Sequence, residues 1–225
     1  FDCGDNQLRM LPPFAPRAVL KTLLAPRNRL QGLDPLVVAV ASLETLDVGG
    51  NVELQKLPRL PSGLQKVDAE NCGLEVLEPL PEELRTVCLS KNKLQDGVPS
   101  VAQLRRLTYL DLRSNGMTGR FRVPDLPCLS PIFLGHNDLR EIVLAPSECL
   151  ATFDVGSNSL KHLPAALGLC PALQSIDASN NDLGEVPACL GYLPKLHRIA
   201  LEGNPLRAAR GRTRARAVLA VLSRE

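Results

Sequence analysis

Histidine and cysteine, the side chains that most often serve as bases, nucleophiles or metal ligands, are few and scattered in this sequence. The chain has 3 histidines and 7 cysteines in 225 residues. His136, His162 and His197 have no second ligand at the spacing of a zinc site, and no C-x-x-C pair occurs. No P-loop, G-x-S-x-G or dinucleotide-binding motif occurs either. The sequence therefore predicts no catalytic residue, no metal site and no cofactor, and indicates a segment that is not an enzyme.

The regular feature of the sequence is a leucine pattern. Residues 107–117 read L-x-x-L-x-L-x-x-N-x-φ, where φ is apolar, and nearly the same string occurs nine more times at intervals of 20 to 23 residues. A repeat of fixed period determines the whole architecture, so we align the sequence on its asparagine position, the anchor. The anchors are Asn6, Asn28, Asn51, Cys72, Asn92, Asn115, Asn137, Asn158, Asn181 and Asn204.

The physical chemistry of the repeat predicts a stacked structure. The L-x-L core alternates with a period of two, as expected for a short strand with one buried face. A single such strand cannot bury its apolar face, so neighbouring repeats stack into a parallel sheet over a shared core. A buried anchor amide can then satisfy backbone groups in the turn after the strand. Cys72 is an acceptable substitute because it is small and carries a weak S–H donor.

This pattern resembles the leucine-rich-repeat family, of the intracellular type with 20–23-residue repeats, over essentially the whole chain. The resemblance implies an α/β solenoid, a right-handed horseshoe with a concave parallel β-sheet and with short helices, 3₁₀ turns and extended segments on its convex side. It implies about ten repeats over residues 1–206, the first of them truncated, and a helical cap over 207–225. It also implies a protein–protein interaction module, a scaffold or adaptor that binds its partner on the concave face.

The segments between the strands differ in kind. Residues 36–42 predict a short helix, and 98–106, 163–169 and 186–192 predict short helical turns that start after proline. Paired prolines predict extended chain over 57–63 and 77–83, which also resemble the proline-rich repeats of some bacterial effectors. Residues 118–128 fit a helix poorly and are expected to be irregular. Residues 207–225 predict a terminal helix, because one of its faces is apolar, with Ala215, Val218, Leu219 and Leu222.

The outward position between the second and third apolar slots forms a column on the predicted concave face. Six of its ten members are aspartate, which is consistent either with a solubilising choice or with an acidic stripe for a basic partner. Cys88 belongs to this column and is expected to face solvent as the most accessible thiol. The column consists of Asp2, Leu24, Asp47, Asp68, Cys88, Asp111, Phe133, Asp154, Asp177 and Ala200.

Phe133 interrupts the aspartates and marks our candidate partner-binding site. An apolar and aromatic cluster on an exposed strand face, surrounded by charge, is typical of a binding hot spot. A scattered exposed aromatic in a slightly irregular repeat is the alternative interpretation. The predicted site consists of Phe133, Tyr109, Asp111, Arg113, Pro131, His136 and Asp154.

Charge and composition restrict the other classes of partner. The net charge is +2, and arginines concentrate in 207–225. The tail has the charge to contact nucleic acid or an anionic membrane, but a solvated face of a capping helix is the interpretation that we favour, because no nucleic-acid-binding module accompanies the arginines. No apolar run is long enough to span a membrane. We therefore expect another protein as the partner, bound by a monomer.

The cysteines bear on the cellular compartment. Their odd number and even scatter argue against a disulfide framework, and no signal peptide or N-x-S/T sequon occurs. These features indicate a reduced, cytoplasmic setting. The chain starts at Phe1 within a half-repeat, which indicates a piece of a longer protein. Two alternatives stay open: the substrate-targeting domain of a larger ligase, kinase or phosphatase, and a receptor ectodomain.

Overall fold

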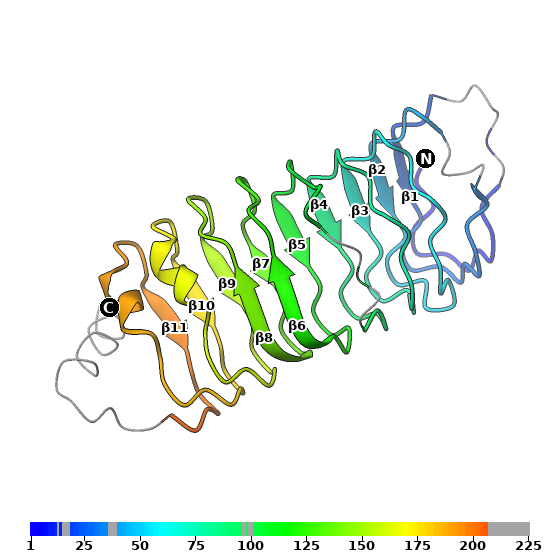
Figure 1. Cartoon of the computed structure of the whole chain (residues 1–225). Helices are drawn as coiled ribbons and strands as arrows, with labels where there is room; N and C mark the ends of the chain where they lie inside the picture. The colour runs from blue at the N-terminus through cyan, green and yellow to red at the C-terminus, as the bar shows by residue number, and fades with distance from the viewer. Residues whose placement is uncertain (13, 15–18, 36–39, 96–97, 99–100, 207–225) are drawn as a thin grey trace. The chain divides into compact units, whose positions relative to one another are not determined.

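The computed structural model describes residues 1–12, 14, 19–35, 40–95, 98 and 101–206. The chain divides into two compact units, Phe1–Gly116 (unit 1) and Met117–Glu225 (unit 2). Each unit is a series of similar coils, in which a short strand is followed by a tight turn at the anchor and by a segment that returns to the next strand (Figure 1).

The strands of unit 1 form one parallel sheet. They are β1 (Thr22–Leu24), β2 (Thr45–Asp47), β3 (Lys66–Asp68), β4 (Thr86–Cys88) and β5 (Tyr109–Asp111), each paired with the next in chain order. The middle residue of each strand is an apolar side chain that is completely buried, from Leu23 to Leu110. The period-two pattern therefore predicted these strands correctly.

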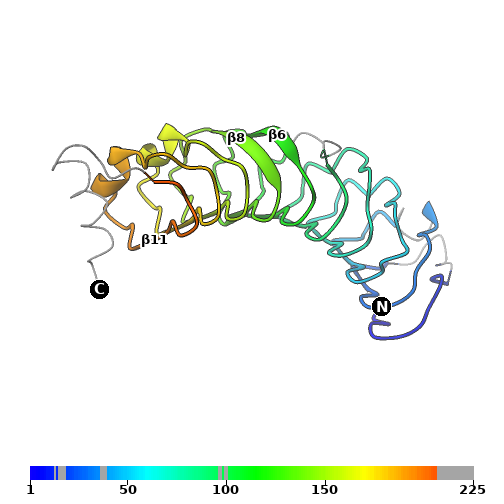
Figure 2. The same ribbon diagram turned by 90° about the horizontal axis from the view of Figure 1, so that it is seen from below.

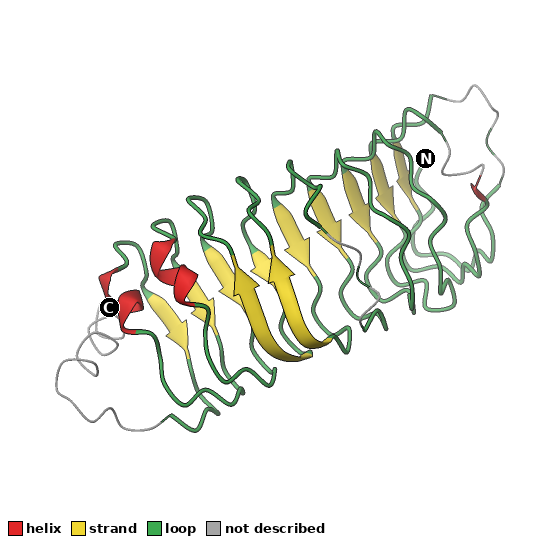
Figure 3. Cartoon of the chain, in the orientation of Figure 1, coloured by secondary structure: helices red, strands yellow, loops and turns green. Residues whose placement is uncertain are grey.

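Unit 2 repeats this arrangement. Its strands β7 (Ile132–Phe133), β9 (Thr152–Asp154), β10 (Ser175–Asp177) and β11 (Arg198–Ala200) are parallel neighbours in that order. Figure 3 shows these strands in yellow and two short helices in red on the return segments. The helices are the 3₁₀ elements η1 (Ala165–Leu169) and η2 (Ala188–Tyr192), which begin directly after Pro164 and Pro187 as predicted.

A second sheet in unit 2 corrects one prediction. Residues 118–123 are not irregular, because they form β6 (Thr118–Val123), which pairs in parallel with β8 (Asp138–Leu144). Figure 2 shows this pair on the opposite side of the coils from β11. Each segment taken alone has a weak strand pattern, but two consecutive repeats place them side by side, where their backbone groups satisfy one another. β8 has a bulge near Arg140, which shifts the alternation of buried and exposed side chains by one residue. Ile142 and Leu144 are therefore buried.

The other return segments agree with the proline pattern where they are described. Residues 57–63 and 77–83 contain no helix. Residues 101–106 make two successive turns and no helix, so the helical turn predicted for 98–106 is replaced by simple turns. Residues 36–39 of the helix predicted over 36–42, and the whole predicted cap 207–225, lie outside the described residues.

The core is aliphatic, and the anchors connect its layers. Leucine, valine and isoleucine fill it in every repeat, and Phe153 is its one completely buried aromatic side chain among the described residues. Asn51 shows the anchor role: its Nδ2 donates to the carbonyl oxygens of Val48 (2.6 Å) and Ala25 (3.0 Å), and its Oδ1 accepts from the Leu30 N–H (3.0 Å). One side chain thus joins two consecutive repeats.

The residue before each anchor has a feature that the sequence pattern did not predict. In all ten repeats its backbone φ is positive, between 50° and 76°. Two of these residues are glycine and the other eight carry side chains, including Arg27, Lys91 and His136. The left-handed conformation turns the backbone N–H toward a carbonyl of the next repeat, as in Arg27 N–H to Gly49 O at 2.7 Å. Stacking thus compensates for a local strain of about 1–2 kcal/mol per residue.

Candidate functional site

The solvent side of each parallel sheet, which we call the strand face, carries the predicted site. Three residues per repeat project from it, spaced two apart along the chain. In unit 1, Tyr109, Asp111 and Arg113 form one such row. The aspartate column aligns by register from strand to strand, with Asp47 beside Asp68 in unit 1 and Asp154 beside Asp177 in unit 2.

The aspartates of the column have a structural role that the sequence analysis did not assign. In each of the six, Oδ1 accepts a hydrogen bond of 3.0–3.2 Å from the backbone N–H two residues later. This contact closes the turn that follows the strand. Leu24, which is not aspartate, is followed two residues later by Pro26, which has no N–H to donate. Turn closure therefore explains much of the aspartate column without a basic partner.

In unit 1 the predicted site is organised around one ion pair. Arg113 Nη2 lies 2.5 Å from Asp111 Oδ2, and Arg113 Nε also donates to the same carboxylate. The side chain of Asp111 is 2% exposed, whereas that of Arg113 is 40% exposed. Asp111 therefore holds the guanidinium in place, and Arg113 is the group that this row presents to solvent. Tyr109 is half-buried beside the pair, and burial raises the pKa of its hydroxyl.

Cys88 contradicts its predicted exposure. It is buried, with 9% of its surface accessible, because side chains on both neighbouring strands flank its short side chain. Burial, followed by the nearby carboxylates of Asp68 and Asp111, raises the pKa of Cys88 to about 11. Cys128 and Cys149, in unit 2, are the exposed thiols instead.

In unit 2 the predicted site contains Pro131, Phe133, His136 and Asp154. Phe133 and Pro131 are half-buried, and Phe133 pairs in register with Asp154 on the next strand. Gly135 lies directly under Asp154: a Cβ added there would be 2.9 Å from Asp154 Oδ1. His136 is exposed and occupies the left-handed position before Asn137, with a φ of 55°. The structure therefore brings together Phe133 and Asp154 within unit 2, as it does Tyr109, Asp111 and Arg113 within unit 1.

Two features are absent from the described residues. Over these residues, no group of three or more His, Cys, Asp and Glu side chains is arranged to hold a metal ion. No helix in the same part of the chain is both long and apolar enough to cross a membrane.

Comparisons with known proteins agree with the repeat pattern. No family model matches the chain. Two curated relatives are similar to it: Receptor-like protein 18 of Arabidopsis thaliana, 32% identical over 135 residues, and Podocan-like protein 1 of Homo sapiens, 29% identical over 157 residues. These matches cover 60% and 55% of this chain, but only 14% and 30% of the length of the relatives.

Solved structures of similar fold cover more of the chain. A leucine-rich-repeat protein of Leptospira interrogans matches 90% of it with a TM-score of 0.70 at 23% identity. The leucine-rich effector protein YopM of Yersinia pestis matches 88% of it with a TM-score of 0.62 at 30% identity. The chain spans 53% and 47% of these two proteins. The chain therefore has a leucine-rich-repeat solenoid fold, and the predicted fold class and the predicted resemblance to leucine-rich-repeat proteins are confirmed.

Proposed function

We propose that this chain is a scaffold or adaptor module that binds a partner protein on its strand face. Leucine-rich-repeat folds of this kind generally mediate protein–protein interaction and are typically not enzymes. The observation that carries the proposal is the half-buried Phe133 in register with Asp154, on the strand face of unit 2, where it is the one aromatic residue of the strands β7, β9, β10 and β11 that faces solvent. An aromatic anchor beside a carboxylate suits a partner segment that combines an apolar side chain with a basic one.

The ion pair on β5 supports the same proposal. Because Asp111 holds Arg113 through several contacts, the guanidinium is pre-organised and loses little side-chain entropy when it binds a partner. Tyr109 beside it has two rotatable side-chain bonds and an apolar ring, the properties of a low-entropy contact residue. We expect Arg113 to contact carbonyl or carboxylate oxygens of the partner.

The proposed site can be tested by capturing partners from a cell lysate with the wild type and with Phe133→Arg. The control is Glu185→Arg, which introduces the same arginine side chain at an exposed residue of a return segment. Thermal unfolding of each variant checks that both are folded. Loss of a specific partner with Phe133→Arg alone supports the strand face as the binding surface. Equal capture by all three proteins contradicts it.

A second candidate is a substrate-targeting domain of a larger ligase, kinase or phosphatase. It is favoured by the likeness to YopM, which is described as an effector protein, and by the incomplete coverage of every relative reported above. Expression of the gene's complete reading frame followed by assays for kinase, phosphatase and ubiquitin-ligase activity tests this candidate. A catalytic domain in the same polypeptide would support it.

We also propose that the module is monomeric and works in a reducing, intracellular compartment. Each of the seven cysteines is a free thiol, which suits that setting. The likeness to a plant receptor-like protein favours the opposite, an extracellular setting. Thiol titration of protein purified from its native source distinguishes them: seven titratable thiols support the intracellular setting, and disulfides that involve cysteines other than Cys128 and Cys149 support the extracellular one. Light scattering gives the oligomeric state.

A further inference from the structure

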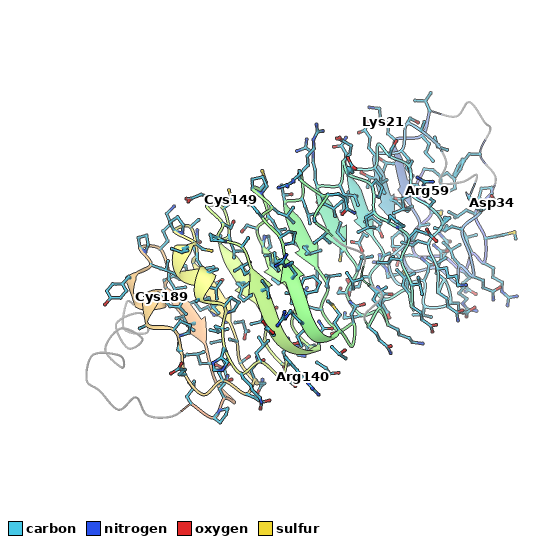
Figure 4. The ribbon with its side chains drawn as sticks, viewed as in Figure 1. Lys21, Asp34, Arg59, Arg140, Cys149 and Cys189 are labelled. Atoms are coloured by element: carbon cyan, nitrogen blue, oxygen red, sulfur yellow. The ribbon has the colours of Figure 1, made fainter. Side chains whose placement is uncertain are left out.

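Two exposed cysteines occupy the same position in consecutive repeats of unit 2. Cys128 precedes Asn137 by nine residues, and Cys149 precedes Asn158 by nine residues. Both side chains are exposed, and both are free thiols. Each lies in the segment that leads into a strand, Cys128 in a turn before β7 and Cys149 in a bend before β9. Figure 4 shows Cys149 at the edge of unit 2 where the chain enters β9, away from Arg140 at the opposite edge.

The register of the flanking strands relates the two cysteines by one repeat. Ile132 pairs with Phe153, an offset of 21 residues that also relates Cys128 to Cys149. Two residues after the cysteines the repeats are in direct contact, because the Ala151 N–H donates to Ser130 Oγ at 2.8 Å. The strands that follow the two cysteines lie about 4.8 Å apart, and a disulfide spans about 4.4–6.8 Å between Cα atoms, so the spacing of the repeats is compatible with a bridge between the two turns.

Unit 1 shows that side chains at this position meet across consecutive repeats. Glu83 precedes Asn92 by nine residues, and Arg106 precedes Asn115 by nine residues. Their side chains form a salt bridge between Arg106 Nη1 and Glu83 Oε2. The position therefore directs both side chains to the same side of the coil. In unit 2 it holds two thiols, and in the next two repeats it holds Ala172 and Lys195.

We propose that Cys128 and Cys149 form a dithiol modification site, which a small disulfide of the glutathione class converts into a bridge between the two repeats. The thiolate of Cys149 attacks one sulfur of the small disulfide and releases one small thiolate, which leaves a mixed disulfide. The thiolate of Cys128 then attacks Cys149 Sγ and releases the second small thiolate. The protein loses two hydrogens, and the oxidant is reduced to two small thiols. The roles of the two cysteines can be exchanged without changing the product.

The other cysteines lack this arrangement. Cys72, Cys88 and Cys170 are buried, and Cys189 is only partly exposed, with its Sγ close to the Ala165 carbonyl oxygen at 3.9 Å. Cys3 lies in unit 1, in the first repeat. The site is thus confined to the two thiols that are both exposed and equivalent by repeat.

The proposal is tested by treating the reduced, folded full chain with oxidised glutathione, quenching with acid and mapping the peptides by mass spectrometry. We expect one linked pair, Cys128 to Cys149, and no retained glutathione on either. In Cys128→Ser and in Cys149→Ser the remaining thiol should retain one glutathione. Because an intramolecular thiol acts at an effective concentration of about millimolar or above, the mixed disulfide should persist roughly tenfold longer or more in these variants than in the wild type.

Cys189→Ser is the matched control and should form the linked pair as the wild type does. Retention of glutathione on both Cys128 and Cys149 of the folded wild type overturns the proposal, because it means that the two thiols do not reach one another. Equal formation of the same pair in urea-unfolded chain also overturns it, because the fold then contributes nothing to the pairing. Neither outcome depends on a partner protein, so the test is independent of the proposed strand-face function.

Discussion

The thiol of Cys72 donates to the carbonyl oxygen of Val48 at 3.1 Å, the type of bond that Nδ2 of an asparagine anchor makes to the preceding repeat. The thiol supplies the donor of the anchor but not its carbonyl acceptor. Leu30 donates its backbone N–H to the Oδ1 of the next anchor at 3.0 Å, whereas the equivalent N–H of Leu54 bonds the carbonyl oxygen of Asn51 instead. Cysteine therefore replaces the donor of the asparagine side chain at this position but not its acceptor.

This difference predicts that Cys72→Asn stabilises the protein. The amide would offer the Leu54 N–H a second acceptor beside the Asn51 carbonyl oxygen and would give the Val48 carbonyl oxygen a stronger donor, which together should raise the free energy of unfolding by about 0.5–1.5 kcal/mol. The measurement is the midpoint of urea unfolding. Cys72→Ala, which removes the donor as well, should lower that midpoint. A lower midpoint for Cys72→Asn than for Cys72→Ala would mean that the amide does not fit this turn.

The anchors of inner repeats should be far more sensitive than the first anchor. Asn51 is completely buried and bonds both its own repeat and the preceding one, so Asn51→Leu leaves backbone groups unpaired and should cost about 3 kcal/mol or more. Asn6 is exposed and donates to the carbonyl oxygens of Cys3 and Gly4, in its own repeat. Asn6→Leu should cost less than about 1 kcal/mol. Equal losses in chemical unfolding would contradict the inter-repeat role of the anchor.

The repeat pattern predicted correctly which residues are buried where every coil buries the same position. Leu110 and Asn115 follow directly from the pattern, because every coil buries the same positions. The strand β6 could not be predicted from residues 118–128, since its partner β8 belongs to the next repeat. The burial of Cys88 was missed for a similar reason: the width of the side chains on neighbouring strands decides it, and no property of its own repeat reveals it.

The candidate site was predictable in part. Phe133 stands out because it interrupts the aspartates, and the register with Asp154 follows from the repeat. The ion pair that buries Asp111 under Arg113 was not predicted, because an aspartate in the column and a charged residue two positions later each look solvent-exposed in sequence. The sequence contains a signal for the closure of turns by the aspartates. Of the residues that lie two positions after the column, Pro26 alone has no backbone N–H, and the column residue before it is Leu24 instead of aspartate.

The left-handed residue before each anchor gives a third prediction. Ser157 has a φ of 53°, a conformation in which its Cβ is strained. Ser157→Gly should relieve this strain and, after the entropy that glycine gains on unfolding, raise the free energy of unfolding by about 0.5–1 kcal/mol. The reverse change, Gly203→Ser, should destabilise, because a Cβ there would lie 2.3 Å from Asn180 Oδ1. Thermal unfolding of both variants tests the pair, and shifts of the same sign would contradict the argument.

The thiols should separate into two classes by their reactivity. Cys128 and Cys149 are exposed, whereas Cys72 and Cys88 are buried and burial raises their pKa values to about 12 and about 11. At pH 8 in iodoacetamide, we expect Cys72 and Cys88 to react more slowly by a factor on the order of 100 or more. Pulse alkylation with peptide mapping measures each site. Rapid labelling of Cys88 in the folded chain would show that its thiol is exposed, as its sequence position suggested, and would contradict its burial in the structure.

Asp68 and Asp5 should respond to pH in opposite directions. Burial, and then the neighbouring Asp47, raise the pKa of Asp68, so that its charge costs stability at neutral pH and protonation removes this cost as pH falls through the folded-state pKa. Asp68→Asn should therefore be more stable than the wild type at pH 7, because it removes the buried charge while its amide oxygen can still accept the Glu70 N–H. This gain should disappear in acid, where the wild-type carboxyl is protonated.

Asp5 should behave in the opposite way, because the hydrogen bond from Arg27 lowers the pKa of its carboxyl group. The ionised carboxylate contributes stability above the unfolded-state pKa, and this contribution is lost as pH falls through the lower folded-state pKa. Asp5→Asn should be slightly less stable at pH 7 and equal to the wild type in strong acid. Melting temperatures of the three proteins from pH 7 down to about pH 2, below the unfolded-state pKa of an aspartate, decide the matter. A gain for Asp68→Asn that grows in acid would show that its carboxylate is stabilised, not destabilised, by the fold.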